Sequence, residues 1–325
     1  MAQRDAYAHI AACTRDPLLI GTLPRSGTWM LRYFLSLVDH FSRSPDLPPI
    51  EQLFRRASAA EFHLDYNDRA SKSQRVAISH WMCPGSVEMC ELSRPDLAAL
   101  LHENGSLEYQ RKMDADHAGF HPKNDARIVF VYRNPLDVYR SYADLFEQRN
   151  QMGDRKPYPF NPMVPWGTEL MNASSDRPFE FFIDNLLESG FAEFFVTYFA
   201  SFLLVRDAFP DRVLFLKYED AMRDRRAYLR SIVEFGRLGT PSQSADAFDK
   251  AVAATEIDAM RRYEAELGHA ISGRSTFYGE RNQTHLSVKK RDWRKVFEDA
   301  LIERFCARVA QLDPRVLSFL PELSA

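Results

Sequence analysis

Short apolar runs alternate with longer stretches of helical periodicity along most of the chain. Runs of a few mainly aliphatic residues are typical of buried strands, and they occur at residues 18–22, 75–79, 127–132 and 212–217. Strands that alternate with helical segments are typical of βαβ units. The pattern therefore predicts an α/β fold in which a central parallel sheet is flanked by helices.

The helical segments are predicted from apolar spacing and from residues that favour helix starts. Residues 27–41 place Leu31, Phe34 and Val38 on one face. Proline is favoured at the first helical position, so a further helix is expected from about Pro135. The same reasoning predicts a helix near Glu219, two helices over 179–209, and a mostly helical chain beyond Pro241 outside residues 272–290.

The stretch from about residue 149 to residue 178 has a different composition, rich in Pro, Asn and aromatic residues. Loops of this length inside a compact domain are usually functional or disordered. We therefore expect a long loop or lid on the acceptor side, where Tyr158, Phe160 and Trp166 suit an apolar ligand. No convincing linker interrupts the chain, so a single domain over residues 1–325 is predicted.

Composition and charge narrow the possible functions. Of the 325 residues, 45% are hydrophobic and 27% charged, as in ordinary globular proteins, and the net charge of −3 disfavours general nucleic-acid binding. The four cysteines lack C-x-x-C spacing, so no zinc site is expected. The N-terminus resembles no signal peptide, and Glu193 interrupts the longest apolar stretch. A cytoplasmic protein without nucleic-acid or membrane partners is expected.

The strongest local signal is the segment LLIGTLPRSGTWML, in which a strand runs through a turn into a helix. That geometry directs backbone N–H groups and a helix N-terminus at one point, which favours an oxyanion such as phosphate. Gly27 allows close approach of a ligand, Ser26 and Thr28 add hydroxyl groups, and Arg25 adds a positive charge.

This turn is not a Walker A loop, because Gly27 is followed by Thr28 and not by lysine. An ATP-dependent kinase would lack that lysine and an evident magnesium site. A P-loop-type nucleotide or small-molecule kinase stays open as an alternative. So does a non-catalytic nucleotide-binding module.

The motif Pro-Arg-Ser-Gly-Thr before a helix resembles the first signature of the sulfotransferases that use 3′-phosphoadenosine 5′-phosphosulfate (PAPS). The resemblance implies a P-loop nucleotide-kinase-like architecture. It also implies that Arg25, Ser26, Gly27 and Thr28 hold the 5′-phosphosulfate, with Arg25 on the transferring group. Trp29, one position earlier than the family's tryptophan, would lie on the adenine side.

The segment RIVFVYRNPLDVYRS resembles the family's second signature. Arg133 follows a predicted strand, and Ser141 comes 141 − 133 = 8 residues later, about two helical turns further along. The two side chains can therefore converge on one anion. The resemblance implies that this anion is the 3′-phosphate of PAPS. It further implies that Tyr218 and Thr255 lie near adenine. The family's Arg-Lys-Gly triplet, which clamps the 3′-phosphate, is replaced here by Leu286-Ser287-Val288, so Lys289, Lys290, Arg291 or Arg281 would have to take its place.

His80 follows the second predicted strand and lies between the two signatures, where the cytosolic members of the family have a histidine. An unperturbed histidine has a pKa near ~6.5 and can accept a hydroxyl proton near neutral pH. His80 is therefore the predicted catalytic base, with Arg25 as the catalytic cation. Glu61 or Asp65 would be the alternative base, since some carbohydrate sulfotransferases use glutamate.

These expectations combine into one function. The chain is predicted to transfer the sulfuryl group of PAPS to a hydroxyl or amine of a small organic acceptor, with PAP (adenosine 3′,5′-bisphosphate) as product. The reaction would need no metal, because the donor is already activated. A monomer and a homodimer both remain possible.

Overall fold

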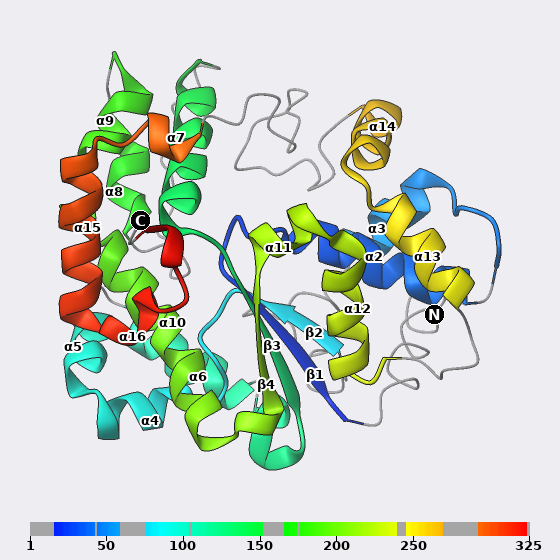
Figure 1. The fold of residues 1–325 in the computed structure, drawn as a ribbon, viewed down its shortest axis with the longest axis horizontal. Coiled ribbons are helices and arrows are strands. Elements are labelled where there is room, and N and C mark those ends of the chain that lie inside the picture. The colour runs from blue at the N-terminus through cyan, green and yellow to red at the C-terminus, as the bar shows by residue number, and fades with distance from the viewer. Residues whose placement is uncertain are drawn as a thin grey trace. The chain divides into compact units, whose positions relative to one another are not determined.

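The computed structural model describes residues 16–42, 44–58, 76–103, 106–116, 118–151, 166–173, 176–238, 245–268 and 292–323. They form two compact units, each built from several parts of the chain (Figure 1). The first unit comprises Met1–His80, Gly119–Tyr132 and Asp211–Lys289, and the second comprises Trp81–Ala118, Arg133–Pro210 and Lys290–Ala325. The assignment of the chain to a single domain stays a prediction.

The first unit is built around a parallel sheet of four strands in the order β2-β1-β3-β4. Its strands are β1 (Leu18–Thr22), β2 (Val76–Ser79), β3 (Arg127–Tyr132) and β4 (Val213–Lys217). The predicted α/β fold with a central parallel sheet is confirmed, and each strand lies within one residue of its predicted bounds. The register aligns Ile20 with Ile78 on one side and with Val129 on the other.

The strand order places a topological switch at β1. The chain passes from β1 to one neighbour, β2, and later returns to pair β3 on the opposite side of β1. Because the strands are parallel, all four carboxyl ends lie at one edge of the sheet. Ligands of open α/β sheets bind beyond that edge, at the switch point. The turn that follows β1 therefore occupies the expected position for a binding loop.

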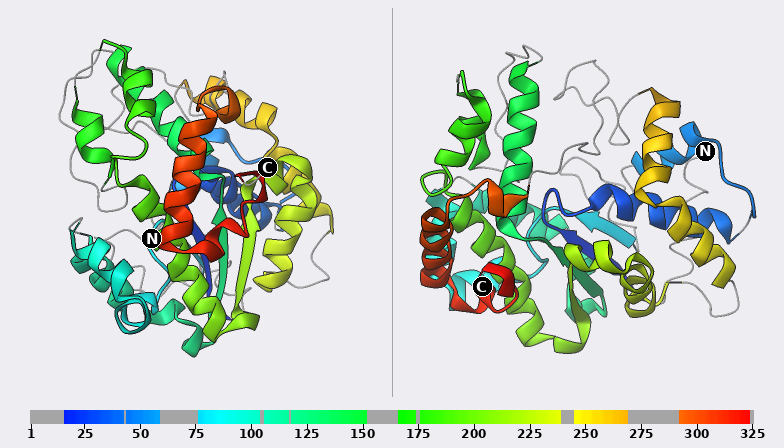
Figure 2. Two further views of the ribbon diagram at one scale, coloured as in Figure 1. Left: turned by 60° about the vertical axis from the view of Figure 1, so that its left-hand side comes forward. Right: turned by 45° about the horizontal axis from the view of Figure 1, so that its top comes forward.

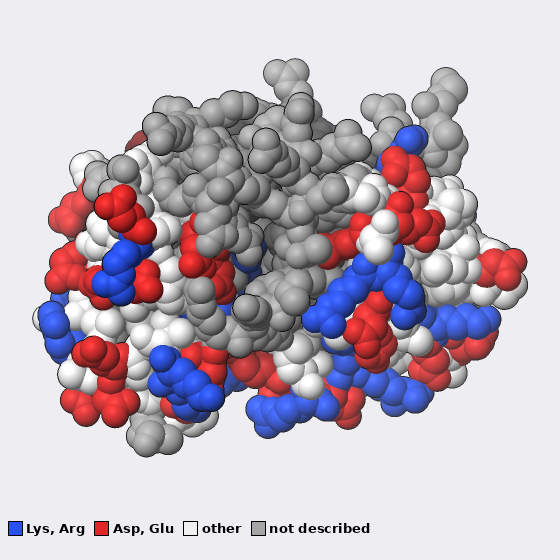
Figure 3. All heavy atoms as spheres, turned by 90° about the horizontal axis from the view of Figure 1, so that it is seen from above, with Lys and Arg blue, Asp and Glu red and all other residues white. Residues whose placement is uncertain are grey.

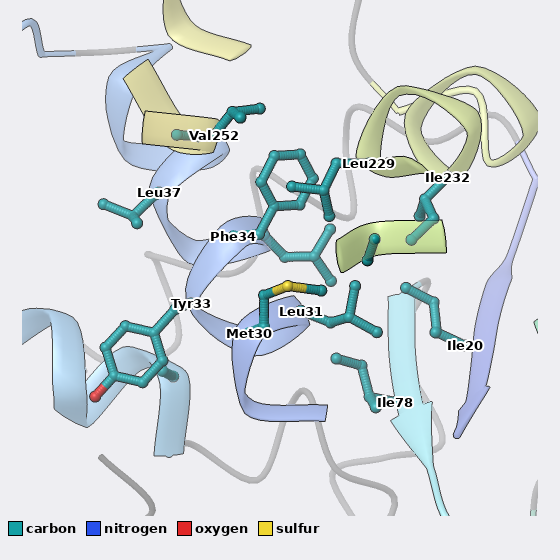
Figure 4. Packing of buried hydrophobic residues seen from close by; sticks show 14 of the residues in the cluster. Ile20, Met30, Leu31, Tyr33, Phe34, Leu37, Ile78, Leu229, Ile232 and Val252 are labelled. Carbon is teal, nitrogen blue, oxygen red and sulfur yellow. The ribbon is translucent and has the colours of Figure 1, made fainter. Parts of the chain in front are cut away.

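Helices cover one face of this sheet, and Figure 4 shows the resulting core. Ile20 and Ile78 from the strands pack with Leu31 and Phe34 of α2 and with Leu229 of α12. Leu19, Ala77, Ile128 and Phe130 on the opposite face are also buried. Burial on both faces explains why the strands read as continuous apolar runs. The helices of the first unit are α2 (Thr28–Phe41), α3 (Ile50–Ser58), α11 (Tyr218–Arg223), α12 (Arg225–Phe235), α13 (Ala245–Ala254) and α14 (Ile257–Leu267).

The described part of the second unit is helical. Its helices are α4 (Ser86–Ser93), α5 (Pro95–Glu103), α6 (Leu107–Asp116), α7 (Pro135–Gln151), α8 (Gly167–Asn172), α9 (Pro178–Asp184), α10 (Phe191–Ala208), α15 (Asp299–Leu312) and α16 (Pro314–Leu317). Helix α10 packs against α4, α5 and α15, and α7 lies beside α9 (Figure 2). The two helices predicted over 179–209 correspond to α9 and α10.

Helix α10 contains the longest apolar stretch of the sequence, and it forms the core of the second unit. Phe195, Phe199 and Phe202 are fully buried, because residues all around this helix meet neighbouring helices. Among the helices that the structure describes, none combines the length and the apolar character needed to cross a bilayer.

The predicted long loop at 149–178 differs from the structure at both ends. Helix α7 continues to Gln151, and α8 occupies Gly167–Asn172. Trp166 is buried, with its ring centroid 5.4 Å from that of Tyr139 and 4.9 Å from that of Phe191, so it packs in an aromatic core. Tyr158 and Phe160 lie outside the described residues. Whether this stretch faces the acceptor stays a prediction.

Candidate active site

The turn after β1 is tightly hydrogen-bonded and leads directly into α2. The Leu23 amide donates to the Val131 carbonyl at 3.1 Å, and the Ser26 amide donates to the Leu23 carbonyl at 3.1 Å. Arg25 has φ 68° and Gly27 has φ 84°, both in the left-handed region. A non-glycine residue in this region costs roughly 1–2 kcal/mol, and such strained residues cluster at functional sites.

Unpaired polar groups gather in this turn. Ser26 is 0% exposed, and its Oγ has no hydrogen-bond partner among the described residues. Within the same part of the chain, no side chain caps the N-terminus of α2, where the first-turn amides lack intrahelical acceptors. A buried hydroxyl without a partner is costly, and a bound oxyanion could satisfy it together with these amides.

Tyr218 approaches this turn from β4. It is the first residue of α11, and its ring lies directly against Gly27, whose missing side chain leaves the space that the ring fills. The structure thus brings together two predicted site residues that are 191 positions apart in the sequence (218 − 27 = 191). Whether Tyr218 borders a nucleotide stays a prediction.

His80 lies beside the same turn because β2 pairs with β1. The register aligns Gly21 with Ser79, so that Thr22 and His80, the next residues, are neighbours. The His80 Nδ1 atom lies 2.8 Å from the Thr22 carbonyl oxygen and 3.0 Å from the Thr22 Oγ1. A carbonyl can only accept, so Nδ1 carries the proton in the neutral ring and Nε2 carries the lone pair.

The pKa of His80 differs from the sequence-based expectation of an ordinary value. Burial of the ring lowers its pKa from 6.5 to about 4, and the nearby Arg32 cation lowers it further, while the hydrogen bond to Thr22 acts in the opposite direction. His80 is therefore neutral at physiological pH. A neutral ring with its lone pair on Nε2 is in the form that a general base requires.

Arg32 is a feature of the site that the sequence analysis missed. It is a buried cation on α2, one helical turn after Thr28, with its guanidinium carbon 4.6 Å from the ring centroid of Trp29. A charged residue among the apolar residues of a helix was the available signal. The Trp29 ring therefore already contacts the Arg32 guanidinium. The contact of Trp29 with adenine stays a prediction.

The structure places Thr255 at the end of α13, fully buried. Its Oγ1 donates to the carbonyl oxygens of Ala251, at 3.0 Å, and Val252, at 2.9 Å. The hydroxyl proton is therefore used within the helix terminus, and a cofactor contact of Thr255 stays a prediction. Lys289 and Lys290, like the alternative bases Glu61 and Asp65, lie outside the described residues.

Arg133 and Ser141, the predicted 3′-phosphate ligands, belong to the second unit. Arg133 directly follows β3 in the chain and its Nη2 lies 3.4 Å from the Asp137 Oδ2. Ser141 lies on α7, and both residues are nearly buried. Asp137 also pairs with Arg140, at 3.2 Å, so one carboxylate serves two guanidinium groups.

Asn134 fixes the helix that carries these two residues. Its Oδ1 accepts from the amides of Leu136, at 2.9 Å, and Asp137, at 3.3 Å, and so caps the N-terminus of α7. This cap was not predicted from the sequence, although an asparagine before a proline-initiated helix was a visible signal. Arg133 therefore precedes a well-defined helix start, with Ser141 two turns further along.

Comparison with known proteins identifies the family. The sulfotransferase domain family matches residues 15–312, nearly the whole chain. A solved structure, mouse sulfotransferase SULT7A1 complexed with PAP, is 14% identical with a TM-score of 0.49, over 100% of this chain and 94% of that one. A search of curated proteins finds no match. The family match over nearly its full length makes this chain a member of the sulfotransferase family.

Proposed function

We propose that this sulfotransferase transfers the sulfuryl group of PAPS to a hydroxyl or amine of a small organic acceptor and releases PAP. The observation that carries the proposal is the buried Ser26 hydroxyl, which has no partner among the described residues and lies in the turn before the uncapped helix α2. This arrangement fits a bound oxyanion, and His80 and Thr22 of the same sheet edge lie beside it.

The donor would be held first by the turn after β1. Arg25, Ser26, Gly27 and Thr28 would bind the phosphosulfate through the cation, the hydroxyls and the amides of α2. Tyr218, which packs on Gly27, would border the nucleotide together with Trp29. Further nucleotide contacts are proposed from the sequence pattern for Arg133, Ser141, Thr255, Lys289 and Lys290.

PAPS and the protein contribute different parts of the proposed reaction. PAPS supplies an activated sulfuryl group, whose sulfur–oxygen bond to phosphate breaks as a bond to the acceptor forms. His80 Nε2 takes the proton of the acceptor, a step worth typically ~10²–10⁴-fold. Arg25 and the turn amides stabilise the negative charge that grows on the leaving oxygen. His80 is ready for this step because its pKa, lowered by burial to about 4, leaves it unprotonated at neutral pH.

The acceptor is proposed to be a small molecule with an apolar body. A sulfated or carboxylated polymer would need an extended basic groove. On the face drawn in Figure 3, basic and acidic side chains of the described residues are interspersed. The net charge of −3 likewise favours a small acceptor over a polyanion.

A thermal-shift experiment tests the donor site. PAP without magnesium is expected to stabilise the protein, by about 2.7 kcal/mol at ~100 times its Kd, whereas ADP and ATP should stabilise it much less. Stabilisation only by magnesium and ATP would contradict the proposal. Transfer of labelled sulfate from PAPS to a panel of phenols, alcohols and amines then distinguishes an enzyme from a module that binds PAP without turnover.

A further inference from the structure

Thr22 contacts two parts of the candidate site at once. It is the last residue of β1 and 0% exposed. Its Oγ1 lies 2.9 Å from the Thr28 Oγ1, at the start of α2, and 3.0 Å from the His80 Nδ1. Its carbonyl oxygen lies 2.8 Å from the same nitrogen. One residue therefore connects the anion-binding turn to the proposed base.

The contacts of this network indicate where its protons lie. The Thr22 carbonyl has no proton, so its contact with His80 requires a proton on Nδ1. Because Nδ1 carries a proton, it cannot accept a hydrogen bond from the Thr22 hydroxyl. The hydroxyl oxygen instead accepts from Nδ1, and the hydroxyl donates its own proton to another acceptor. Of the two hydrogen-bond contacts that the described residues Thr28 and Ser79 offer this hydroxyl, the Thr28 Oγ1 at 2.9 Å is better placed than the Ser79 carbonyl at 3.5 Å.

The same assignment orients Thr28. Its Oγ1 accepts the Thr22 proton, so its own proton is left to point away from Thr22. At the first residue of α2, an anion in the turn is a natural acceptor for that proton. The chain of donors therefore runs from His80 Nδ1 through the two threonine hydroxyls, and it leaves the lone pair of His80 on Nε2.

We propose that Thr22 is a positioning residue that holds His80 with its lone pair on Nε2 and directs the Thr28 hydroxyl toward the bound anion. The proposal rests on the function proposed above, because it gives His80 the part of the base. Thr22 does not touch the reacting atoms. It acts through His80 and Thr28, and its hydroxyl is the only part of the side chain that the network uses.

The hydroxyl of Thr22 can be removed by mutation without changing the shape of the side chain much. Valine has nearly the same outline as threonine and suits a buried strand end, but it lacks the hydroxyl. Thr22→Val therefore removes the connection with little change in packing, whereas Thr22→Ser keeps the hydroxyl. Thr197 provides a matched control: it is buried on α10, and its Oγ1 has no hydrogen-bond partner in the described part of the chain.

The kinetic test compares these variants. Thr22→Val is expected to lower kcat/KM by roughly 2–10-fold, the worth of a typical neutral hydrogen bond, whereas Thr22→Ser stays near wild type. Thr197→Val is expected to leave turnover unchanged. Wild-type turnover in Thr22→Val, or an equal loss in Thr22→Ser, would overturn the proposal.

A second measurement does not depend on turnover. Nitrogen NMR of the full-length protein without ligand, with the His80 signal assigned from a His80→Gln spectrum, reports which ring nitrogen carries the proton. Thr22→Val keeps the carbonyl that accepts from Nδ1, so we expect the Nδ1–H form in the wild type and in both variants. A proton on Nε2 in the wild type would overturn the positioning role. If the Nδ1–H form is found but the protein transfers no sulfate, the positioning contact stands and the proposed function fails.

Discussion

The ring of Tyr218 occupies the place where a side chain on Gly27 would lie. A Cβ added to Gly27 would stand 2.7 Å from the Tyr218 Cδ2, and closer still to Cε2. Gly27 also has φ 84°, which L side chains rarely adopt. The glycine is therefore required both by its backbone conformation and by the ring that packs on it.

Gly27→Ala is expected to weaken PAP binding and to destabilise the fold. The left-handed conformation costs roughly 1–2 kcal/mol with a Cβ, and Tyr218 must also move. Gly268→Ala is the matched control, since Gly268 has φ 67° and a methyl group there would meet no atom of the described residues within 4 Å. Chemical denaturation and calorimetric PAP titration of both variants separate the backbone cost from the displacement of Tyr218. Equal effects of the two variants on PAP affinity would show that the Tyr218 contact is irrelevant to binding.

Arg25→Ala is expected to lower kcat by roughly 10²–10³-fold while the protein stays folded, because the lost charge acts on the transferring group. Arg25→Lys should recover part of the rate. Arg55→Ala, which removes an exposed arginine paired with Glu51, is the control and should leave kcat unchanged. Steady-state sulfation assays on variants checked by circular dichroism provide the measurement. Wild-type kcat in folded Arg25→Ala would exclude this assignment.

Arg133→Ala is expected to weaken PAP binding by roughly 10–150-fold, since a charge-assisted contact contributes about 1.5–3 kcal/mol. The fold should persist, because Asp137 keeps its second partner, Arg140. AMP, which lacks the 3′-phosphate, serves as the control ligand in calorimetry. Its affinity should differ little between wild type and variant. Unchanged PAP affinity would place the 3′-phosphate elsewhere.

His80→Ala is expected to lower kcat by ~10²–10⁴-fold and to leave PAP binding nearly unchanged. The pH dependence provides an independent measurement. Because burial lowers the pKa of His80 to about 4, the neutral base persists above that pH, and activity should be lost only as the pH falls through it. The acid limb of kcat/KM should thus lie well below ~6.5, the value for an unperturbed histidine.

The same shift predicts a pH dependence of stability. Between pH about 6.5 and pH about 4, the unfolded chain binds a proton at His80 that the folded protein does not bind. The free energy of unfolding should therefore fall as the pH is lowered through this window. His80→Gln should show a weaker fall.

A fully active His80→Ala variant that keeps the acid limb would assign the base to another residue, with Glu61 and Asp65 the next to test.

Local patterns in the sequence were sufficient for the strands, the turn and the family. The apolar run at Leu18–Thr22 and the Pro-Arg-Ser-Gly-Thr motif depend on residues that are neighbours in the chain. Hydrophobic periodicity and turn chemistry act over a few residues, and they are visible without the fold. The position of Arg133 after a strand was predictable for the same reason.

The state of His80 was decided only by the tertiary structure. Thr22 and His80 are 58 positions apart and meet because β1 and β2 pair in one register, with Gly21 opposite Ser79. The lowered pKa of His80 depends on burial and on Arg32, and the contact of Gly27 with Tyr218 depends on β4 reaching the same edge of the sheet. Hydrogen bonding, desolvation and packing depend on distances through space, and these are set only when the strands assemble.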